Sequence, residues 1–354
     1  METRILSQNQ LNEVVHDLNC DGVVAFPTDT VYGLAVRVVS KQAILKLTQA
    51  KNRPQDKPYP LLVSSIQQIE AFAQLTHRDR QLIHQWMPGS VTFVFRKNPG
   101  LDNDYFAEST TIAFRMPTDL WIKTLLDEIK EPLLLTSANI SGEPAAVSSD
   151  EVIASLSGKI DCVVSGIAGC GIPSTIIDAS RFDLQLIRKG TIDMKDIEAK
   201  SKTVALACDH GAYPHKEAIK VRLTELGYTI EDFGTFDNAS VDYPDTVYPA
   251  AKSVSEGKNT WGIVMCGTGI GASITANKVT GIRCALVFDK ETAHITREHN
   301  DSNVLAMGGR LVDEKTAVEI AEIWLNSPFS NDERHIRRIS KLTDVENKEK
   351  THER

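Results

Sequence analysis

The sequence predicts an α/β fold in two domains, the second of them a three-layer α/β/α domain built on a parallel sheet. Its 354 residues are roughly twice the usual size of a single domain, which favours two hydrophobic cores. Short runs rich in β-branched residues alternate with segments of helical periodicity along the chain. After residue 203 the alternation becomes strict, as expected for parallel strands joined by helices on both faces of a sheet.

The first domain is assigned to residues 1–198. The predicted strands in this part are residues 22–26, 132–138 and 174–179, and the predicted helices are residues 40–51 and 148–156. Its last strand ends near Gly190. Residues 191–202 follow as a polar stretch without an apolar period, which is typical of a linker.

The second domain is assigned to residues 203–347. Strands are expected at residues 203–209, 229–234, 261–267, 281–289 and 303–309, and helices at residues 217–227, 245–257, 273–279, 290–300 and 314–326. A terminal helix is expected over residues 331–346, with a frayed charged tail after it. In such a fold, ligands bind at the carboxyl ends of the strands.

Composition excludes several classes of protein. Hydrophobic residues make up 42% and charged residues 24%, which argues against disorder and low complexity. The net charge of −8 is spread over both halves, so bulk charge does not indicate a nucleic-acid binder, although a local cationic groove stays open. The six cysteines are scattered, which fits a reducing compartment. Neither a signal peptide nor a long apolar run is present, so we expect a cytoplasmic protein without a membrane segment.

The strongest local motif is CGTGIG, residues 266–271, between a buried strand and a helix. Its glycines allow close approach of the backbone, and several N–H groups at the positive end of a helix dipole favour an anion. Cys266 at that position favours the thiolate, which can act as a base or nucleophile. A tight strand-to-helix turn with a buried cysteine is the alternative.

Other polar residues lie near strand ends in this domain and are predicted to converge with Cys266. They are Asp209, His210, Tyr243, His299 and Asn300. Each has a plain structural alternative, such as a helix cap or a half-buried aromatic. Arg334 and Arg338 are four residues apart on the terminal helix and could hold a phosphate together, with a solvated basic face as the alternative.

Residues 203–347 closely resemble the RpiB branch of the RpiB/LacA/LacB sugar-phosphate isomerases. The shared motifs, in family order, are CDHGA, DYPD, CGTGIG, NKVTGIRCAL, REHNDSNVLAMGGR and RHIRR. The resemblance implies a Rossmann-like domain that interconverts ribose 5-phosphate and ribulose 5-phosphate through a cis-enediol, without a metal, in a homodimer whose site is built across the dimer interface. Galactose 6-phosphate and allose 6-phosphate isomerases are the main alternatives.

The same resemblance implies roles for individual residues. Cys266 would be the base that moves a proton between C2 and C1, and His299 would open the furanose ring. Thr268 and the amides of Gly267 and Gly271 would hold the enediolate. Sugar hydroxyls would be bound by Asp209, Tyr243 and Asn300, and phosphate by His210, Arg310, Arg334 and Arg338.

The first domain carries a different set of motifs. They are PTDTVYGLA (27–35), KNRPQDKP (51–58), TIAFRMP (111–117), TSANISG (136–142), PSTIID (173–178) and IRKG (187–190). Cationic side chains recur beside turn residues at Lys51, Arg53, Lys57 and Arg188, which favours a polyphosphate site. A solvated surface turn and a cluster of N-caps are the alternatives. No Walker loop or dinucleotide-binding fingerprint is present.

These motifs resemble the YrdC-type threonylcarbamoyl-AMP synthases over about residues 7–198. The resemblance implies a twisted α/β fold that condenses L-threonine, bicarbonate and ATP with Mg²⁺ into L-threonylcarbamoyladenylate and pyrophosphate, for downstream proteins that transfer the threonylcarbamoyl group to tRNA. Thr30, Arg115, Ser137 and Ser174 would contact threonine, and Lys51, Arg53, Lys57, Asn139 and Arg188 would bind ATP. Many relatives carry a histidine in the strand where this chain has YPLLVSS. The alternative is a non-catalytic RNA-binding or ribosome-associated module.

Overall fold

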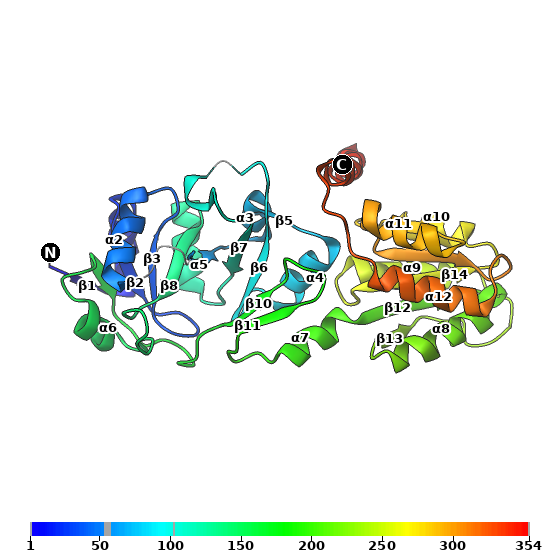
Figure 1. The fold of residues 1–354 in the computed structure, drawn as a ribbon, viewed down its shortest axis with the longest axis horizontal. Helices are drawn as coiled ribbons and strands as arrows, with labels where there is room; N and C mark the ends of the chain where they lie inside the picture. The colour runs from blue at the N-terminus through cyan, green and yellow to red at the C-terminus, as the bar shows by residue number, and fades with distance from the viewer. Residues whose placement is uncertain (1, 53–57, 102, 353–354) are drawn as a thin grey trace. The chain divides into compact units, whose positions relative to one another are not determined.

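The computed structural model describes residues 2–52, 58–101 and 103–352, with side chains up to residue 349. The chain divides into two compact units. Unit 1 comprises Met1–Leu75 and Trp86–Met194, and unit 2 comprises Thr76–Gln85 and Lys195–Arg354. The α/β fold predicted from the sequence is present in both units (Figure 1).

The described strands of unit 1 form one mixed sheet in the order β1-β9-β2-β3-β8-β4-β7-β6-β10-β11, with β5 paired to β6. The strands are β1 (Arg4–Leu6), β2 (Val24–Phe26), β3 (Gly33–Arg37), β4 (Leu61–Leu62), β5 (Ala73–Gln74), β6 (Val91–Lys97), β7 (Thr111–Arg115), β8 (Leu133–Ser137), β9 (Cys162–Val164), β10 (Thr175–Asp178) and β11 (Gln185–Arg188). The sheet combines antiparallel pairs, such as β3 with β8, and parallel pairs, such as β6 with β10.

The helices of unit 1 cover this sheet. They are α1 (Leu11–Asn19), α2 (Lys41–Lys51), α3 (Ile66–Phe72), α5 (Leu120–Ile129) and α6 (Ser149–Leu156), with 3-10 turns η1 (Gln8–Gln10) and η2 (Asp104–Phe106). Apolar side chains of α1 and α5 pack on the central strands in one buried cluster. The backbone N–H of Ala43 donates to the Ser40 hydroxyl at the start of α2, and Asn52 ends that helix with φ 50°. These caps place Lys51 in the last turn of α2.

Unit 2 contains a fully parallel sheet in the order β13-β12-β14-β16-β15. Its strands are β12 (Thr203–Cys208), β13 (Thr229–Asp232), β14 (Trp261–Cys266), β15 (Cys284–Leu286) and β16 (Val304–Gly308). Its helices are α4 (His77–Trp86), α7 (Met194–Ser201), α8 (Tyr213–Glu225), α9 (Tyr243–Ser255), α10 (Ile270–Ala276), α11 (Lys290–Asn300), α12 (Glu314–Asn326) and α13 (Glu333–His352), with η3 (His210–Ala212).

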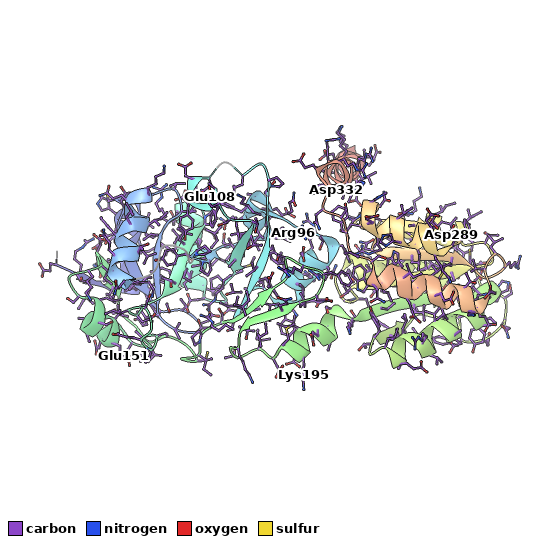
Figure 2. All side chains as sticks on the ribbon, viewed as in Figure 1. Arg96, Glu108, Glu151, Lys195, Asp289 and Asp332 are labelled. Carbon is purple, nitrogen blue, oxygen red and sulfur yellow. The ribbon has the colours of Figure 1, made fainter. Side chains whose placement is uncertain are left out.

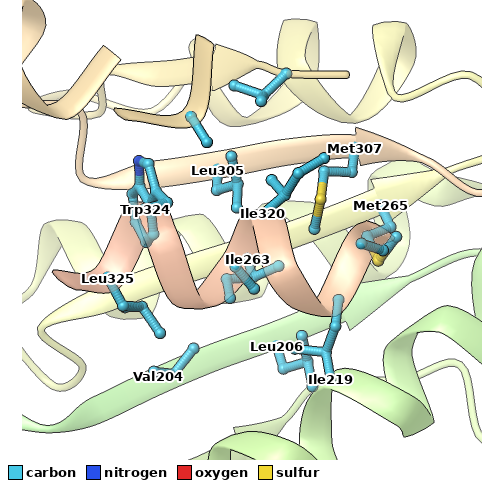
Figure 3. Packing of buried hydrophobic residues seen from close by; sticks show 14 of the residues in the cluster. Val204, Leu206, Ile219, Ile263, Met265, Leu305, Met307, Ile320, Trp324 and Leu325 are labelled. Atoms are coloured by element: carbon cyan, nitrogen blue, oxygen red, sulfur yellow. The ribbon is translucent and has the colours of Figure 1, made fainter. Parts of the chain in front are cut away.

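The side chains of the parallel strands alternate between two buried clusters, as the period of a β-strand requires. Val204 and Leu206 face α8, α11 and α12, where Trp324 is fully buried (Figure 3). Ala205 and Ala207 face α9 and α10 instead. The predicted three-layer α/β/α arrangement is confirmed, and short side chains on one face let α9 and α10 lie close to the sheet.

Three details differ from the sequence-based expectation. The stretch expected to be a linker contains α7, which buries Ile197. The expected charged tail is helical through His352, because nothing in that run breaks a helix. Residues 76–85 fall within the range assigned to the first domain, but they pack in unit 2, where Gln81 donates to the carbonyl of Val254 at 3.4 Å.

Caps and charges on the outer surface fix the ends of the unit 2 helices. Asp289 accepts from the N–H of Thr292 at the start of α11, and Asp332 lies just before α13 (Figure 2). A carboxylate at a helix N-terminus satisfies an unpaired N–H and suits the dipole. These two helices carry the predicted residues His299, Arg334 and Arg338.

Candidate functional sites

Loops from three neighbouring strands meet at the carboxyl edge of the parallel sheet. The N–H of Gly309, after β16, donates to the carbonyl of Cys266 at 3.0 Å, and the N–H of Arg310 donates to the carbonyl of Gly267 at 2.9 Å. A Cβ on Gly211, after β12, would lie only 3.0 Å from the Cα of Gly267. The glycines are therefore needed for the close approach of these loops.

Cys266 lies at the centre of this edge, and its side chain is a hydrogen-bond acceptor. The residue is 4% exposed, and its Sγ accepts from the N–H of Gly269 at 3.1 Å. Gly269 has φ 76°, and a Cβ there would lie 2.7 Å from the carbonyl carbon of Met307. The sulfur is therefore held by a backbone N–H donor at the start of α10.

The domain contains two further cysteines, Cys208 and Cys284. Burial raises the pKa of Cys208 to about 12, and burial also raises the pKa of Cys284 to about 12. Both thiols therefore stay protonated and act as small apolar side chains.

Predicted ligand-binding residues surround Cys266 at the same edge. The ring of Tyr243 packs over Gly271, where a Cβ would lie 2.5 Å from the ring Cζ. The guanidinium of Arg310 packs over Gly267, where a Cβ would lie 3.2 Å from Nε. We call this group the carboxyl-edge site; its members are Asp209, His210, Tyr243, Cys266, Gly267, Thr268, Gly271 and Arg310.

Hydrogen bonds fix the loops of the carboxyl-edge site. The Asp209 carboxylate accepts from the N–H of Gly211 at 2.8 Å, and the Nδ1 of His210 accepts from the N–H of Val241 at 3.3 Å. The hydroxyl of Thr268 accepts from the N–H of Ile270 at 3.4 Å. Polar groups from three loops are thus ordered around the Cys266 sulfur.

Within a single copy of the chain, His299 and Asn300 do not join this group. The prediction that they converge with Cys266 is therefore wrong for the single chain. Both end α11, just before β16 begins at Val304. The register pairs Gly262 with Val304 and Cys266 with Gly308, so residues before Val304 lie at the amino edge of the sheet. Four residues of strand span about 13 Å, which separates the amino edge from Cys266. A residue before a parallel strand cannot share an edge with a residue after one.

The terminal helix adds to a second group, the amino-edge site, made of His299, Asn300, Arg334, His335 and Arg338. The rings of His299 and His335 are 4.3 Å apart between centroids, and His299 Nε2 lies 3.4 Å from a Glu298 carboxylate oxygen. Burial lowers the pKa of His335, and His299 and Arg334 lower it further. Arg334 and Arg338 are exposed, so their guanidinium groups remain accessible to an anion.

In unit 1, the two predicted motifs around Lys51 and Asn139 come together. The Nζ of Lys51, which is 2% exposed, donates to the carbonyls of Ser137 and Asn139 and to the Asn139 side-chain oxygen at 3.1 Å. The Ser137 hydroxyl donates to the same Asn139 oxygen at 2.6 Å. Arg53 and Lys57 lie outside the described residues.

A second predicted cluster lies at Arg115 and Ser174. Arg115 donates to a carboxylate oxygen of Asp29 at 2.6 Å, and its buried Nε has no hydrogen-bond partner among the described residues. Arg188 donates to the carbonyl of Ser174 at 2.9 Å. Burial lowers the pKa of Arg188, and the nearby charge of Arg115 lowers it further. Two guanidinium groups are therefore held in one neighbourhood, where an anion would be stabilised.

Thr30 lies in the loop between β2 and β3, where its hydroxyl is 3.0 Å from that of Thr28. The same loop supplies Asp29, which sequence reasoning missed. The signal for Asp29 was its place between two threonines in the motif around PTDT, where a charged residue is enclosed by buried neighbours.

The described residues contain no group of three or more His, Cys, Asp or Glu side chains arranged to hold a metal ion. Within the same described ranges, each helix is too short or too polar to cross a membrane.

Comparison with known proteins places each half of the chain. A family model described as Ribose/Galactose Isomerase matches residues 204–342. A model described as Telomere recombination, for Sua5-, YciO- and YrdC-type proteins, matches residues 16–190.

Individual relatives agree with these matches. YwlF of Bacillus subtilis is 49% identical over 146 residues, which are 41% of this chain and 97% of that protein. Ribose-5-phosphate isomerase B of Escherichia coli is 38% identical over 145 residues, with coverage of 41% and 97%. The threonylcarbamoyl-AMP synthase of Pyrococcus abyssi is 33% identical over 178 residues, or 50% of this chain and 52% of that protein.

The chain thus spans about half the length of the threonylcarbamoyl-AMP synthases that it matches. A solved structure of a P. abyssi Sua5 double variant has a TM-score of 0.52 and 22% identity, and the match covers 77% of this chain and 94% of that one, which supports the fold alone. Because relatives above 30% identity are covered almost completely by the second half, the chain belongs to the Ribose/Galactose Isomerase family, and its first half is similar to Sua5-, YciO- and YrdC-type proteins over residues 16–190.

Proposed function

We propose that the chain is a bifunctional enzyme, with ribose-5-phosphate isomerase activity in its second half and L-threonylcarbamoyladenylate synthase activity in its first half. The observation that carries the isomerase is the Cys266 sulfur, which accepts the Gly269 N–H among the residues of the carboxyl-edge site. The relatives with near-complete coverage support the same reaction class.

In this proposal, Cys266 acts as the base of the isomerisation. Its thiolate takes the proton from C2 of the open-chain aldose, and the C–H electrons form the C1–C2 double bond of a cis-enediolate. The thiol returns the proton to C1 while a proton passes from O2 to O1, which gives the ketose. The N–H groups of Gly267 and Gly271 and the Thr268 hydroxyl are assigned to the developing oxyanion.

A second copy of the chain would complete the isomerase site. His299, assigned to ring opening, and the phosphate-binding pair Arg334 and Arg338 lie in the amino-edge site, away from Cys266. A homodimer through this domain would set the amino-edge site of one copy against the carboxyl-edge site of the other. In a two-fold dimer, both composite sites form at once.

For the synthase, we assign Lys51, Asn139 and Arg188 to the ATP phosphates and nucleotide, together with Arg53 and Lys57. Arg115 is assigned to the threonine carboxylate, and its unpartnered Nε supports a bound anion. Thr30, Ser137 and Ser174 would contact the rest of threonine. Mg²⁺ would arrive on the triphosphate, where it screens negative charge as the carbamate oxygen attacks the α-phosphate and pyrophosphate leaves.

The product of the first half would be a mixed anhydride, which is an activated acyl donor. We therefore expect a later reaction that transfers its threonylcarbamoyl group to tRNA. The contrasting hypothesis, a non-catalytic RNA-binding or ribosome-binding module, requires none of the threonine contacts. Pyrophosphate release that depends on threonine, bicarbonate and ATP separates the two hypotheses. Release without threonine, or tight tRNA binding without release, would contradict the synthase assignment.

Substrate preference of the second half is tested on the same purified chain. Isomerisation is measured with ribose 5-phosphate, galactose 6-phosphate and allose 6-phosphate. We expect the highest kcat/KM with ribose 5-phosphate, because the chain retains His299 and Asn300 together with both arginines of α13. A higher kcat/KM with either hexose phosphate would replace the substrate assignment.

A further inference from the structure

Helix α4 supplies a residue to the isomerase unit from the first part of the sequence. It lies between β5 and β6 in chain order, but Thr76–Gln85 belong to unit 2. Its first residue, His77, is 6% exposed, and its backbone N–H donates to a carboxylate oxygen of Asp301 at 2.7 Å. Asp301 directly follows Asn300 and is two residues from His299.

The hydrogen bonds of the His77 ring settle its protonation. Nε2 lies 2.7 Å from the carbonyl oxygen of Thr260, which can only accept, so Nε2 carries the proton. Nδ1 then accepts from the side-chain amide of Asn303 at 3.2 Å, and the same amide nitrogen donates to the carbonyl of Gly281. The neutral ring is thus bonded at both nitrogens, and it lies 5.5 Å from the ring of Trp261.

Asp301 is the point at which α4 meets the turn after α11. The residue is 3% exposed and has φ 44°, a left-handed conformation that a side chain other than glycine disfavours. Arg297 donates to one carboxylate oxygen at 2.7 Å, and Arg283 donates to the other at 3.0 Å. The His77 N–H is therefore a third donor to a buried carboxylate that holds a left-handed turn.

The same contacts hold the backbone on either side of the turn. Arg283 donates to the carbonyls of Asn300 at 3.1 Å and Asp301 at 2.6 Å, and Arg297 donates to the carbonyl of Ser302 at 2.8 Å. Arg297 also stacks over Trp261 at 4.5 Å. The backbone that carries His299 and Asn300 is thus fixed by a network to which α4 contributes the His77 N–H, and the charge of Arg80 on the same helix also acts on Asp301.

We infer that His77 is a positioning residue for the isomerase reaction: through Asp301 it fixes the turn that presents His299 and Asn300 to the sugar. This inference rests on the proposed function, in which His299 opens the furanose ring. It assigns α4 a role in the second activity, although the helix is encoded within the first half.

The test separates ring opening from enediol chemistry. Isomerisation of ribose 5-phosphate starts from a closed ring and needs His299, whereas exchange of the C1 proton of ribulose 5-phosphate with D₂O needs Cys266 and no ring opening. A displaced turn should slow the first reaction and spare the second. Loss of the fold would slow both to the same degree.

The variant is His77→Pro in the full chain, since proline fits the first position of a helix and removes only the N–H and the imidazole. We expect kcat for ribose 5-phosphate to fall about tenfold or more, because small displacements of a catalytic group are costly. C1 exchange at saturating ribulose 5-phosphate should stay within about twofold of wild type. His77→Ala, which keeps the N–H, should lose less, and His84→Ala, on the exposed side of α4, should lose nothing.

Wild-type rates for both reactions in His77→Pro would overturn the inference, and so would equal loss of both. If His77→Pro does not fold by circular dichroism, Asp301→Asn weakens the same hydrogen bond from the acceptor side and decides by the same two rates. Failure of the wild-type chain in both reactions would instead contradict the proposed function.

Discussion

The predicted synthase site of unit 1 and the predicted isomerase site of unit 2 differ in how far their residues come together within a single copy of the chain. Lys51 meets Ser137 and Asn139 directly in unit 1, although 86 residues separate Lys51 from Ser137. In unit 2, Cys266 and His299 are only 33 positions apart in sequence, but they lie at opposite edges of the sheet. Distance along the chain is therefore a poor guide to which residues share a site, and strand direction is a better one.

The two sites also differ in how their cations are held. The Lys51 ammonium is buried among carbonyl oxygens, so its position is fixed before any ligand arrives. Arg334 and Arg338 lie on an exposed helix and are not fixed in this way. We expect loss of a buried, oriented cation to cost more than loss of an exposed one.

The largest expected effect is on Cys266. Cys266→Ala should lower kcat for ribose 5-phosphate by about a hundredfold or more, the usual contribution of a general base. Threonine-dependent pyrophosphate release should stay near the wild-type rate, because that site lies in unit 1. Retained isomerisation would point to a different proton acceptor.

The same variant tests whether the two edges combine between copies. Cys266→Ala and His299→Ala proteins, each inactive alone, are unfolded together, refolded at equal concentrations and assayed. Mixed dimers would contain one intact composite site of two, so random pairing should restore roughly a quarter of wild-type activity. No restoration would mean that Cys266 and His299 act within one copy.

The next effect is a pH-dependent loss of stability in unit 2. Burial lowers the pKa of His77 from 6.5 to about 4, so the folded state holds the ring neutral while the unfolded state takes up a proton. The stabilisation is complete above about pH 6.5, is lost as the pH falls towards 4, and amounts to about 3 kcal/mol. Protonation would place two donors, Nδ1 and the Asn303 amide, against each other.

Urea unfolding followed by tryptophan fluorescence at pH 7, 6, 5 and 4 measures this effect. At pH 7 we expect His77→Gln to be less stable than the wild type. As the pH falls, the wild type loses stability through His77 and the variant does not, because glutamine does not titrate. The difference between their free energies of unfolding should therefore shrink. A constant difference across this pH range would show that His77 does not set the acid sensitivity.

Much of the fold was predictable because the period of apolar residues changes visibly between strand and helix. The alternation of Val204 and Leu206 with Ala205 and Ala207 indicates a strand covered on both faces, and the structure confirms it. The packing of α4 in unit 2 was not predictable, because its contacts with Asp301 and Thr260 join positions far apart in sequence. Its amphipathic pattern says that a face is buried, but not against which sheet.

For the sites, motif spacing predicts roles for Cys266 and Lys51 because each lies at the boundary of an element, next to glycine or capping residues, and the structure confirms those positions. Placing His299 beside Cys266 failed, because a loop before a strand and a loop after one look alike in sequence. Asp29 and His77 were missed for a related reason. Their functions depend on a partner, Arg115 or Asp301, that no local pattern reveals.

Removal of the buried cation in unit 1 should have a smaller effect than loss of Cys266. Lys51→Ala removes a charge expected to face the ATP phosphates and three hydrogen bonds to the Ser137–Asn139 loop. Charge-assisted bonds contribute about 1.5 to 3 kcal/mol each, so threonylcarbamoyladenylate formation should fall at least about tenfold. Arg53→Ala is expected to act in the same direction.

The matched control is Lys46→Ala on the same helix, whose Nζ donates to the carbonyl of Asp21. That variant should form threonylcarbamoyladenylate at close to the wild-type rate. Isomerase activity should be unchanged in both variants. Equal loss in Lys46→Ala and Lys51→Ala would indicate damage to α2 and not loss of a phosphate contact.

The smallest effect is expected at the exposed arginine pair. Arg338→Ala should raise KM for ribose 5-phosphate by about three- to tenfold with little change in kcat, because a phosphate contact binds a part of the substrate that does not react. The rise should shrink with added salt, since exposed charges are screened. Arg337→Ala, the neighbour on another face of α13, should leave KM unchanged. If the two variants behave alike, the basic face of α13 acts only through its overall charge, and the pairing of Arg334 with Arg338 has no special role.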